Sequence, residues 1–310
     1  MTRDNITVVK EFFLVGFSSI KSCNILLFII FLMIYCMTLL GNSLISVLVS
    51  ISHNLKSPMY IFLLHLSLAD LLLTINIAPN MLYIVLMEGG YIDIAGCITQ
   101  FYLLGCSGIT ECLLLTVMSY DRYLAICNPL RYRTIMNSSC CYQLVTCCWS
   151  CGFSLMLVTV ILVSRLQFCG HIINYLFCDL TPLLEMACSD TYTVEIENII
   201  VAVLVTLFPS LFILITYVCI LLTILRISSS TGRHKAFSTC SSHLIVVCMY
   251  YGSLVTIYVF PSRINAMNIK KVLSLLYTLV TPFFNPIIYS LRNQEIIAAI
   301  RVYIVPHSIN

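Results

Sequence analysis

Charged residues are scarce in this chain. Aspartate, glutamate, lysine and arginine make up 9% of its 310 residues, whereas apolar residues make up 60%. An ordinary soluble domain carries about 25% charged residues, so this sequence has too few charges to cover the surface of a soluble protein of its length. The net charge of +3 gives no indication of nucleic-acid binding. The composition predicts a membrane protein.

The chain also lacks several features that would indicate other functions. It has no long linker, no low-complexity tract and no repeat of fixed period. Inverted repeats with interrupted helices, which are typical of transporters, are not found. No nucleophile, base and metal ligands converge to suggest an enzyme. The first 22 residues carry two acids and two lysines, so we expect no cleavable signal peptide and an uncleaved first span.

Seven apolar stretches are long enough to cross a bilayer, because a spanning helix needs about 20 residues. They are Ile25–Ile51, Pro58–Met87, Cys97–Cys127, Tyr142–Val163, Glu195–Leu225, Ala236–Phe260 and Val272–Leu291. The sequence therefore predicts an all-α membrane protein with one seven-helix transmembrane domain at 25–291. An N-terminal tail at 1–24 precedes it and a C-terminal tail at 292–310 follows it, on opposite sides of the membrane.

Charge distribution and a glycosylation motif predict an extracellular N-terminus. With that orientation, nine lysines and arginines lie on the cytoplasmic side and seven lie outside, a small bias in the expected direction. Asn5 begins an Asn-Ile-Thr motif, which is glycosylated only on the lumenal side. We therefore expect a multi-pass plasma-membrane protein with a glycan at Asn5.

The 17 cysteines fall into two groups. Twelve lie within or beside the predicted spans, where free cysteine packs as a small apolar residue, and no redox or zinc function is expected of them. The other five, Cys23, Cys97, Cys169, Cys178 and Cys188, fall on the extracellular side, where disulfides form. The spacing alone does not say which of these pair.

Two acids lie near the middle of predicted spans, Asp70 in the second and Glu111 in the third. Ionisable residues inside a membrane are rare and usually functional. Two nearby carboxylates share a proton readily, or hold a cation such as sodium with neighbouring hydroxyls. We expect one of these two arrangements; the alternative is that both acids are neutral and simply hydrogen-bonded. No other cofactor is predicted.

A second charged feature is MSYDRYLAIC, at the end of the third predicted span. Asp121 and Arg122 are adjacent there, and no aspartate or glutamate occurs from Asn198 to Gln294. Arg122 therefore has no acidic partner on the last three spans, where Tyr217, Tyr289 and His243 offer polar groups instead. The alternative is an arginine that extends to the lipid interface.

Prolines in the last three spans favour a bundle that can move. Pro209, Pro261 and Pro286 each remove a backbone hydrogen bond and permit a kink. Pro286 is preceded by Asn285 and followed one turn later by Tyr289. The alternative is the ordinary tolerance of membrane helices for proline.

Six motifs are distributed along almost the whole chain. They are FFLVGFS at Phe12–Ser18, Gly41-Asn42, SPMYIFLLHLSLADL at Ser57–Leu71, MSYDRYLAIC at Met118–Cys127, KAFSTCSSHL at Lys235–Leu244 and NPIIYSLRN at Asn285–Asn293. Together they resemble the vertebrate olfactory receptors, a family in the rhodopsin-like class of G-protein-coupled receptors. The resemblance implies an odorant receptor that binds small, mostly apolar ligands within the bundle and activates a stimulatory, olfactory-type G protein to raise cyclic AMP. The alternative is a non-olfactory chemosensory receptor of the same class for a small endogenous metabolite.

The resemblance also implies roles for particular residues. An activation switch would comprise Asp121, Arg122, Tyr123, Tyr217, Asn285, Pro286 and Tyr289. Disulfides would join Cys97 to Cys178 and Cys169 to Cys188, and residues 294–305 would form a short amphipathic helix on the inner leaflet. The ligand set would be Leu104, Gly108, Ile109, Cys112, Val201, Val205, Tyr251, Leu254, Val255, Tyr258 and Thr278.

Residues that differ from those of related receptors restrict the class of ligand that we expect. Tyr175 stands where many olfactory receptors carry a histidine near Cys178, so we expect no metal ion at the ligand site. An amine receptor would need an acid at the position of Leu104, and an opsin would need a lysine at the position of Leu279. Both other receptor types are disfavoured.

Overall fold

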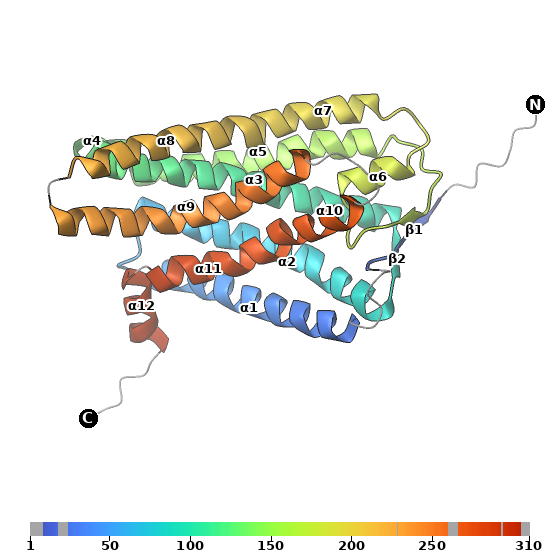
Figure 1. Cartoon of the computed structure of the whole chain (residues 1–310), viewed down its shortest axis with the longest axis horizontal. Helices are drawn as coiled ribbons and strands as arrows, with labels where there is room; N and C mark the ends of the chain where they lie inside the picture. The colour runs from blue at the N-terminus through green and yellow to red at the C-terminus, as the bar shows by residue number, and fades with distance from the viewer. Residues whose placement is uncertain (1–8, 18–23, 228, 260–265, 293, 305–310) are drawn as a thin grey trace, which may run out of the picture.

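The computed structural model describes residues 9–17, 24–227, 229–259, 266–292 and 294–304. Figure 1 shows an elongated bundle of helices with the two termini at opposite ends. A small β-sheet lies at the end that carries the N-terminus, which we call the sheet end. The last helix, α12 (Gln294–Ile304), lies at the other end, the α12 end.

The long helices follow the predicted spans with shifts of a few residues. They are α1 (Asn24–Ile51), α2 (Pro58–Met87), α3 (Ile94–Cys127), α5 (Ser138–Val163), α7 (Tyr192–Ala202) continuing through the π-helix η2 (Val203–Leu207) into α8 (Phe208–Leu225), α9 (Ser230–Val259), and α10 (Ala266–Leu275) continuing through the π-helix η3 (Leu276–Val280) into α11 (Thr281–Arg292). Short helices α4 (Pro129–Ile135) and α6 (Leu180–Met186) lie in the connections.

Among the described residues, six helical stretches are long and apolar enough to cross a membrane. The remaining predicted span, the sixth at Ala236–Phe260, corresponds to α9, whose described apolar stretch is His243–Leu254. Helix α9 begins with the polar sequence STGRHKAFSTCSSH. The structure therefore supports six of the seven predicted spans by length and composition, and at the sixth it gives a long helix with a shorter described apolar stretch.

Capping residues account for two of the shifted helix starts, those of α3 and α5. The apolar pattern predicts a fourth span from Tyr142, but α5 begins at Ser138, because the Asn137 side chain accepts a hydrogen bond from the Cys140 amide at 2.9 Å. Asp93 likewise caps α3, accepting from the Gly96 amide at 3.2 Å. A side-chain acceptor at this position satisfies a free amide of the first turn. A span predicted from a run of apolar residues misses a first helical turn that is polar.

The sheet is an addition to the predicted all-α fold. Strand β1 (Glu11–Leu14) pairs antiparallel with β2 (Gly90–Asp93), with Glu11 opposite Asp93, and parallel with β3 (Ile172–Ile173). The order of strands in the sheet is β2-β1-β3. Part of the predicted N-terminal tail is therefore fixed against the bundle, with Phe12 and Leu14 fully buried.

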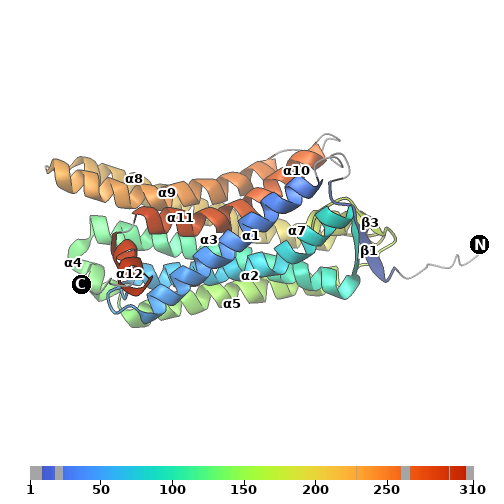
Figure 2. The ribbon, with the colours of Figure 1, turned by 90° about the horizontal axis from the view of Figure 1, so that it is seen from below.

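Helix α3 runs through the interior of the bundle and packs against α2, α5 and α8 (Figure 2). The α3–α5 contact is close at Gly152 of α5. A Cβ there would lie 2.6 Å from the Thr110 hydroxyl and 2.8 Å from the Cys106 carbonyl oxygen. Only a residue without a side chain fits this approach.

Pro286 leaves the carbonyl of Pro282, one turn earlier in α11, without its usual amide donor. The Asn42 side chain of α1 donates to that carbonyl at 3.0 Å. The neighbouring Gly41 lets α1 approach, since a Cβ there would lie 2.8 Å from the Pro286 ring. A neighbouring helix thus satisfies the group that the proline frees, as membrane helices require. Outward faces carry large apolar side chains such as Leu40, which is 71% exposed.

Candidate functional site

A cavity of about 200 Å³ lies among α3, α5, α7, α9, the two π-helices and the segment around α6. Its lining consists of Phe101, Leu104, Gly105, Gly108, Ile109, Cys112, Met156, Thr159, Asp179, Leu180, Thr181, Asn198, Val201, Ala202, Val205, Thr206, Tyr250, Leu254 and Tyr277. Both π-helices contribute, η2 through Val205 and Thr206 and η3 through Tyr277. Such segments are frequent at functional sites.

Seven predicted ligand residues line this cavity: Leu104, Gly108, Ile109, Cys112, Val201, Val205 and Leu254. Tyr251 and Thr278 are not among the lining residues. The Tyr251 hydroxyl donates instead to the Cys112 carbonyl at 3.1 Å, and the Thr278 hydroxyl donates to the Ser274 carbonyl at 2.7 Å. The side chains of Val255 and Tyr258 lie outside the described residues.

Tyr250, next to the predicted Tyr251, faces the cavity. Its hydroxyl donates to the Gly108 carbonyl at 2.7 Å, and the Cys112 thiol lies 3.6 Å from its oxygen. Helix periodicity assigns the face of α9 only to within one residue, which is why the sequence pointed to its neighbour. Tyr250 therefore connects α9 to α3 at the wall of the cavity.

The segment after Cys178 supplies lining residues that the sequence did not reveal. Cys178 is bonded to Cys97 at the start of α3, and its amide donates to the Gln100 side chain at 2.9 Å. These contacts hold the following residues, Asp179 among them, against the cavity. The second predicted bridge, Cys169–Cys188, is also formed. The only sequence signal for Asp179 was its position beside a predicted disulfide.

Asp179 has few partners for an acid in this setting. One carboxylate oxygen accepts from the Leu180 amide at 2.8 Å, and the other has a long contact of 3.5 Å with the Tyr277 hydroxyl. Partial burial raises the pKa of Asp179 above its usual range, against the opposing effect of these hydrogen bonds.

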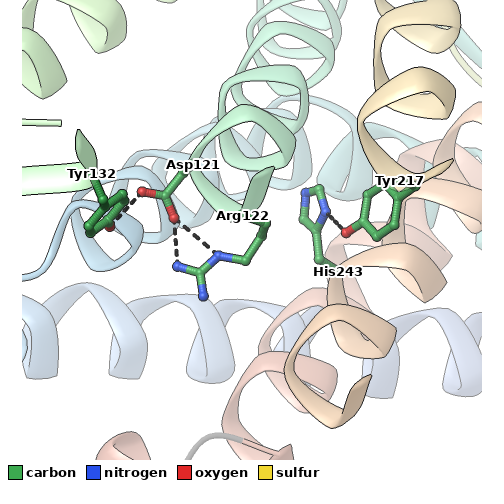
Figure 3. Close-up of polar contacts among 5 residues, drawn as sticks. All are labelled: Asp121, Arg122, Tyr132, Tyr217 and His243. Carbon is green, nitrogen blue, oxygen red and sulfur yellow. Dashed lines mark hydrogen bonds and ion pairs between the residues drawn. The ribbon is translucent and has the colours of Figure 1, made fainter. Parts of the chain in front are cut away.

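Near the α12 end, Asp121 and Arg122 form an ion pair (Figure 3). Arg122 Nη2 and Nε donate to one Asp121 oxygen at 2.6 and 3.1 Å. The other Asp121 oxygen accepts from the Tyr132 hydroxyl of α4 at 2.8 Å. Asp121 is fully buried, and Arg122 exposes 15% of its side chain. The sequence predicted the pair but did not identify Tyr132, because it lies on a separate short helix.

Figure 3 shows Tyr217 and His243 on the side of Arg122 away from Tyr132. The Tyr217 hydroxyl and His243 Nδ1 share a hydrogen bond of 2.5 Å, and both residues are buried. Neither makes a hydrogen bond to Arg122, and the Tyr217 hydroxyl also has a long contact of 3.5 Å with the Cys240 carbonyl oxygen. The buried Tyr289 hydroxyl has no hydrogen-bond partner among the described residues. Tyr123 is half-buried, and its hydroxyl accepts a long contact of 3.5 Å from Asn128.

The two midspan acids lie close enough to interact electrostatically. Asp70 is fully buried and accepts from the Asn285 amide at 3.1 and 2.9 Å, one contact to each oxygen. Glu111 is 1% exposed, and within the described chain neither of its carboxylate oxygens has a hydrogen-bond partner. Burying such groups without partners is costly. No cluster of three or more histidine, cysteine or acidic residues suited to a metal occurs among the residues described.

Comparisons with known proteins identify the family. A family model described as "Olfactory receptor" matches residues 31–306. Olfactory receptor 11L1 from Homo sapiens is 44% identical over 302 residues, which cover 97% of this chain and 94% of that protein. Olfactory receptor 287 from Rattus norvegicus is 42% identical over 301 residues, covering 97% of each. The chain belongs to the olfactory receptor family.

This result confirms the resemblance drawn from the sequence motifs. The receptor is a multi-pass plasma-membrane protein and not an enzyme. Olfactory receptor 6P1 from Homo sapiens is 44% identical over 294 residues, which cover 94% of the receptor and 93% of that relative. As a member of this family, the receptor is an odorant-sensing G-protein-coupled receptor.

Proposed function

We propose that the receptor binds a small, mostly apolar odorant in the cavity between α3 and α9 and then activates a stimulatory, olfactory-type G protein that raises cyclic AMP. The observation that carries the proposal is the cavity itself. Apolar side chains dominate its lining, and small-molecule sites are commonly apolar clefts with a few polar groups.

Two helices connect the cavity to the switch in this proposal. Helix α3 carries Gly108 and Cys112 at the cavity and the Asp121–Arg122 pair further along. Helix α9 carries Tyr250 at the cavity and His243 two turns away. A ligand that favours a different arrangement of α9 against α3 therefore affects both the cavity and the switch residues. It shifts the equilibrium between the resting and active states only by the difference in its affinity for those two states.

We also propose that the sheet end faces outside, that Asn5 carries a glycan and that the α12 end faces the G protein. Asn5 lies outside the described residues. Disulfides at the sheet end support this orientation, because they form in oxidising compartments. Placing Arg122 at the cytoplasmic end puts its charge where a G protein can reach it.

Asp70 and Glu111 are proposed to share a proton or a sodium ion. The buried Glu111 carboxylate without hydrogen bonds among the described residues supports this, since an acid so placed needs a proton or a cation. The measurement is the sodium dependence of signalling for Glu111→Gln. Unchanged signalling and sodium sensitivity would contradict the proposal.

The function is tested by a cyclic-AMP reporter screen against a chemically broad odorant panel, in cells that carry the olfactory G protein. For an active odorant, Gly108→Leu should abolish the response, because its side chain enters the cavity opposite the Tyr250 hydroxyl. Gly252→Leu is the matched control: a Cβ there meets no atom within 4 Å, and the residue does not line the cavity. Surface expression is measured for both.

Silence of the unaltered receptor across the panel despite normal surface expression would overturn the proposed coupling. Equal responses of the two glycine variants would overturn the proposed cavity.

A further inference from the structure

The polar groups of the cavity are unevenly distributed. Asp179 and Thr181 belong to the segment held by the Cys97–Cys178 bridge, and Asn198 lies in α7, about two turns before Thr206 of η2. The deeper lining, around Cys112, is mainly apolar; its polar groups include Thr206 and the Tyr250 hydroxyl, which is bonded to the Gly108 carbonyl. A ligand in this space meets polar groups at the sheet end and apolar walls further in.

The polar groups at the sheet end are short of hydrogen-bond donors from the protein. Among the residues that the structure describes, one Asp179 oxygen has only a 3.5 Å contact with the Tyr277 hydroxyl. The Asn198 side chain makes no hydrogen bond to another described residue, although it lines the cavity. An ionised carboxylate accepts hydrogen bonds and donates none. This end of the cavity therefore offers an acceptor that a ligand can satisfy.

The charged group that lines this end of the cavity is the acid Asp179, whereas the nearby buried Lys271 donates to the Gly16 carbonyl and the Asn174 side chain and does not line the cavity. No lysine, arginine or histidine occurs among the described residues that line the cavity. Behind the lining residue Thr159, the Glu197 carboxylate accepts from the Thr159 hydroxyl at 2.9 Å. A ligand carboxylate would meet Asp179, with Glu197 beyond the lining and no cation among the described lining residues, and like charges at short range repel.

We infer that the preferred ligands carry a hydrogen-bond-donating head group, a hydroxyl or a protonated amine, on an aliphatic tail. The head group donates to Asp179 at the sheet end, and the tail extends toward Cys112 and Tyr250. Asp179 is fixed before binding by the disulfide at the preceding residue and by its hydrogen bond to the Leu180 amide, so little ordering is required. Carboxylate ligands are selected against. The inference rests on the proposed binding cavity.

The test uses four ligands with the same chain length: an n-alkyl amine, an n-alkyl alcohol, a methyl alkyl ether and an alkyl carboxylate, from butyl to decyl. The amine and the alcohol should activate the unaltered receptor at concentrations about tenfold to a hundredfold lower than the ether and the carboxylate, because a site built for a donor rejects analogues without one. An ether as potent as the alcohol, or a carboxylate as the most potent member, would overturn the inference.

Asp179→Asn removes the charge but keeps an oxygen that accepts from the Leu180 amide, so the start of α6 retains its cap. The amine should lose about tenfold or more in potency, the alcohol less, and the carboxylate should gain. Glu185→Gln is the matched control, because it removes an exposed carboxylate from the same short helix without touching the cavity. A uniform shift of all four ligands in Asp179→Asn would indicate a purely structural role and overturn the inference.

Binding is also read without the G protein, as the ligand-dependent rise in the thermal unfolding temperature of the purified full-length receptor. If the ligands raise the unfolding temperature in the predicted order but produce no cyclic-AMP signal in cells, the proposed coupling is contradicted and the inference is supported. Responses to odorants of other classes, with none to amines or alcohols of any length in either assay, would overturn the inference and leave the proposed function standing. If Asp179→Asn does not reach the cell surface, the order of potency of the four ligands on the unaltered receptor decides whether the inference holds.

Discussion

Replacing Asp121 with asparagine should raise signalling in the absence of odorant. The carboxylate holds Arg122 through two hydrogen bonds to one oxygen and Tyr132 through the other. An asparagine has the same shape but only one accepting oxygen, and its NH₂ group opposes the second donor. The resting arrangement therefore loses at least one charge-assisted hydrogen bond, which is worth about 1.5–3 kcal/mol.

The structure allows this figure to be used without a discount for solvent. Asp121 is 0% exposed and Arg122 is 15% exposed, whereas surface ion pairs are weakened by water and salt. Each 1.4 kcal/mol changes an equilibrium about tenfold. A receptor whose active state is populated at about 1% would then be active at about 10% or more, provided that the lost interaction belongs mainly to the resting state.

Two further variants separate the ion pair from the rest of the network. Tyr132→Phe removes only the hydrogen bond to Asp121 and leaves Arg122 as the sole partner of a buried carboxylate, so basal signalling should fall or stay unchanged. Burial and the neighbouring Asp121 raise the pKa of Tyr132, so its hydroxyl remains a donor at physiological pH. Tyr120→Phe is the control, because its hydroxyl has no hydrogen-bond partner among the described residues.

The assay is basal cyclic AMP divided by surface receptor, measured by flow cytometry of an N-terminal epitope tag. Thermal unfolding of the purified variants reports any loss of folding stability separately. Unchanged basal signalling in Asp121→Asn at normal surface expression would refute the reasoning. So would an equal rise in Tyr132→Phe, because the ion pair would then not be the element that holds the resting state.

Three further predictions concern packing, the disulfide and pH. Gly152→Ala should cost about 1–3 kcal/mol through overpacking and reduce surface expression, whereas Gly108→Ala, where the added Cβ makes only an ordinary contact at 3.6 Å, should be expressed normally. Replacing Cys169 and Cys188 together by serine should lower stability by about 3 kcal/mol, seen as earlier thermal unfolding of the purified receptor. Because burial raises the pKa of Asp179, lowering extracellular pH should neutralise it above the usual range for aspartate; amine potency should then fall while alcohol potency changes little.

Sequence alone predicted the class of fold, the family and seven membrane-spanning helices, six of which are long and apolar enough in the described structure. These features are local or one-dimensional: a span is read from a run of apolar residues, and the motifs are contiguous. It also identified the Asp121–Arg122 pair, because two adjacent charges beside a span and the absence of acids from Asn198 to Gln294 are both visible in the chain.

Tertiary structure decided what depends on residues that are far apart in the chain. The sheet joins β1 to strands at Gly90–Asp93 and Ile172–Ile173, and strands of two to four residues carry too little pattern to be predicted. Tyr132 reaches Asp121 only because α4 folds back beside α3. Asp179 faces the cavity only because the Cys97–Cys178 bridge ties its segment to α3. A side chain's partners are set by which segments pack together, and that is a property of the folded bundle.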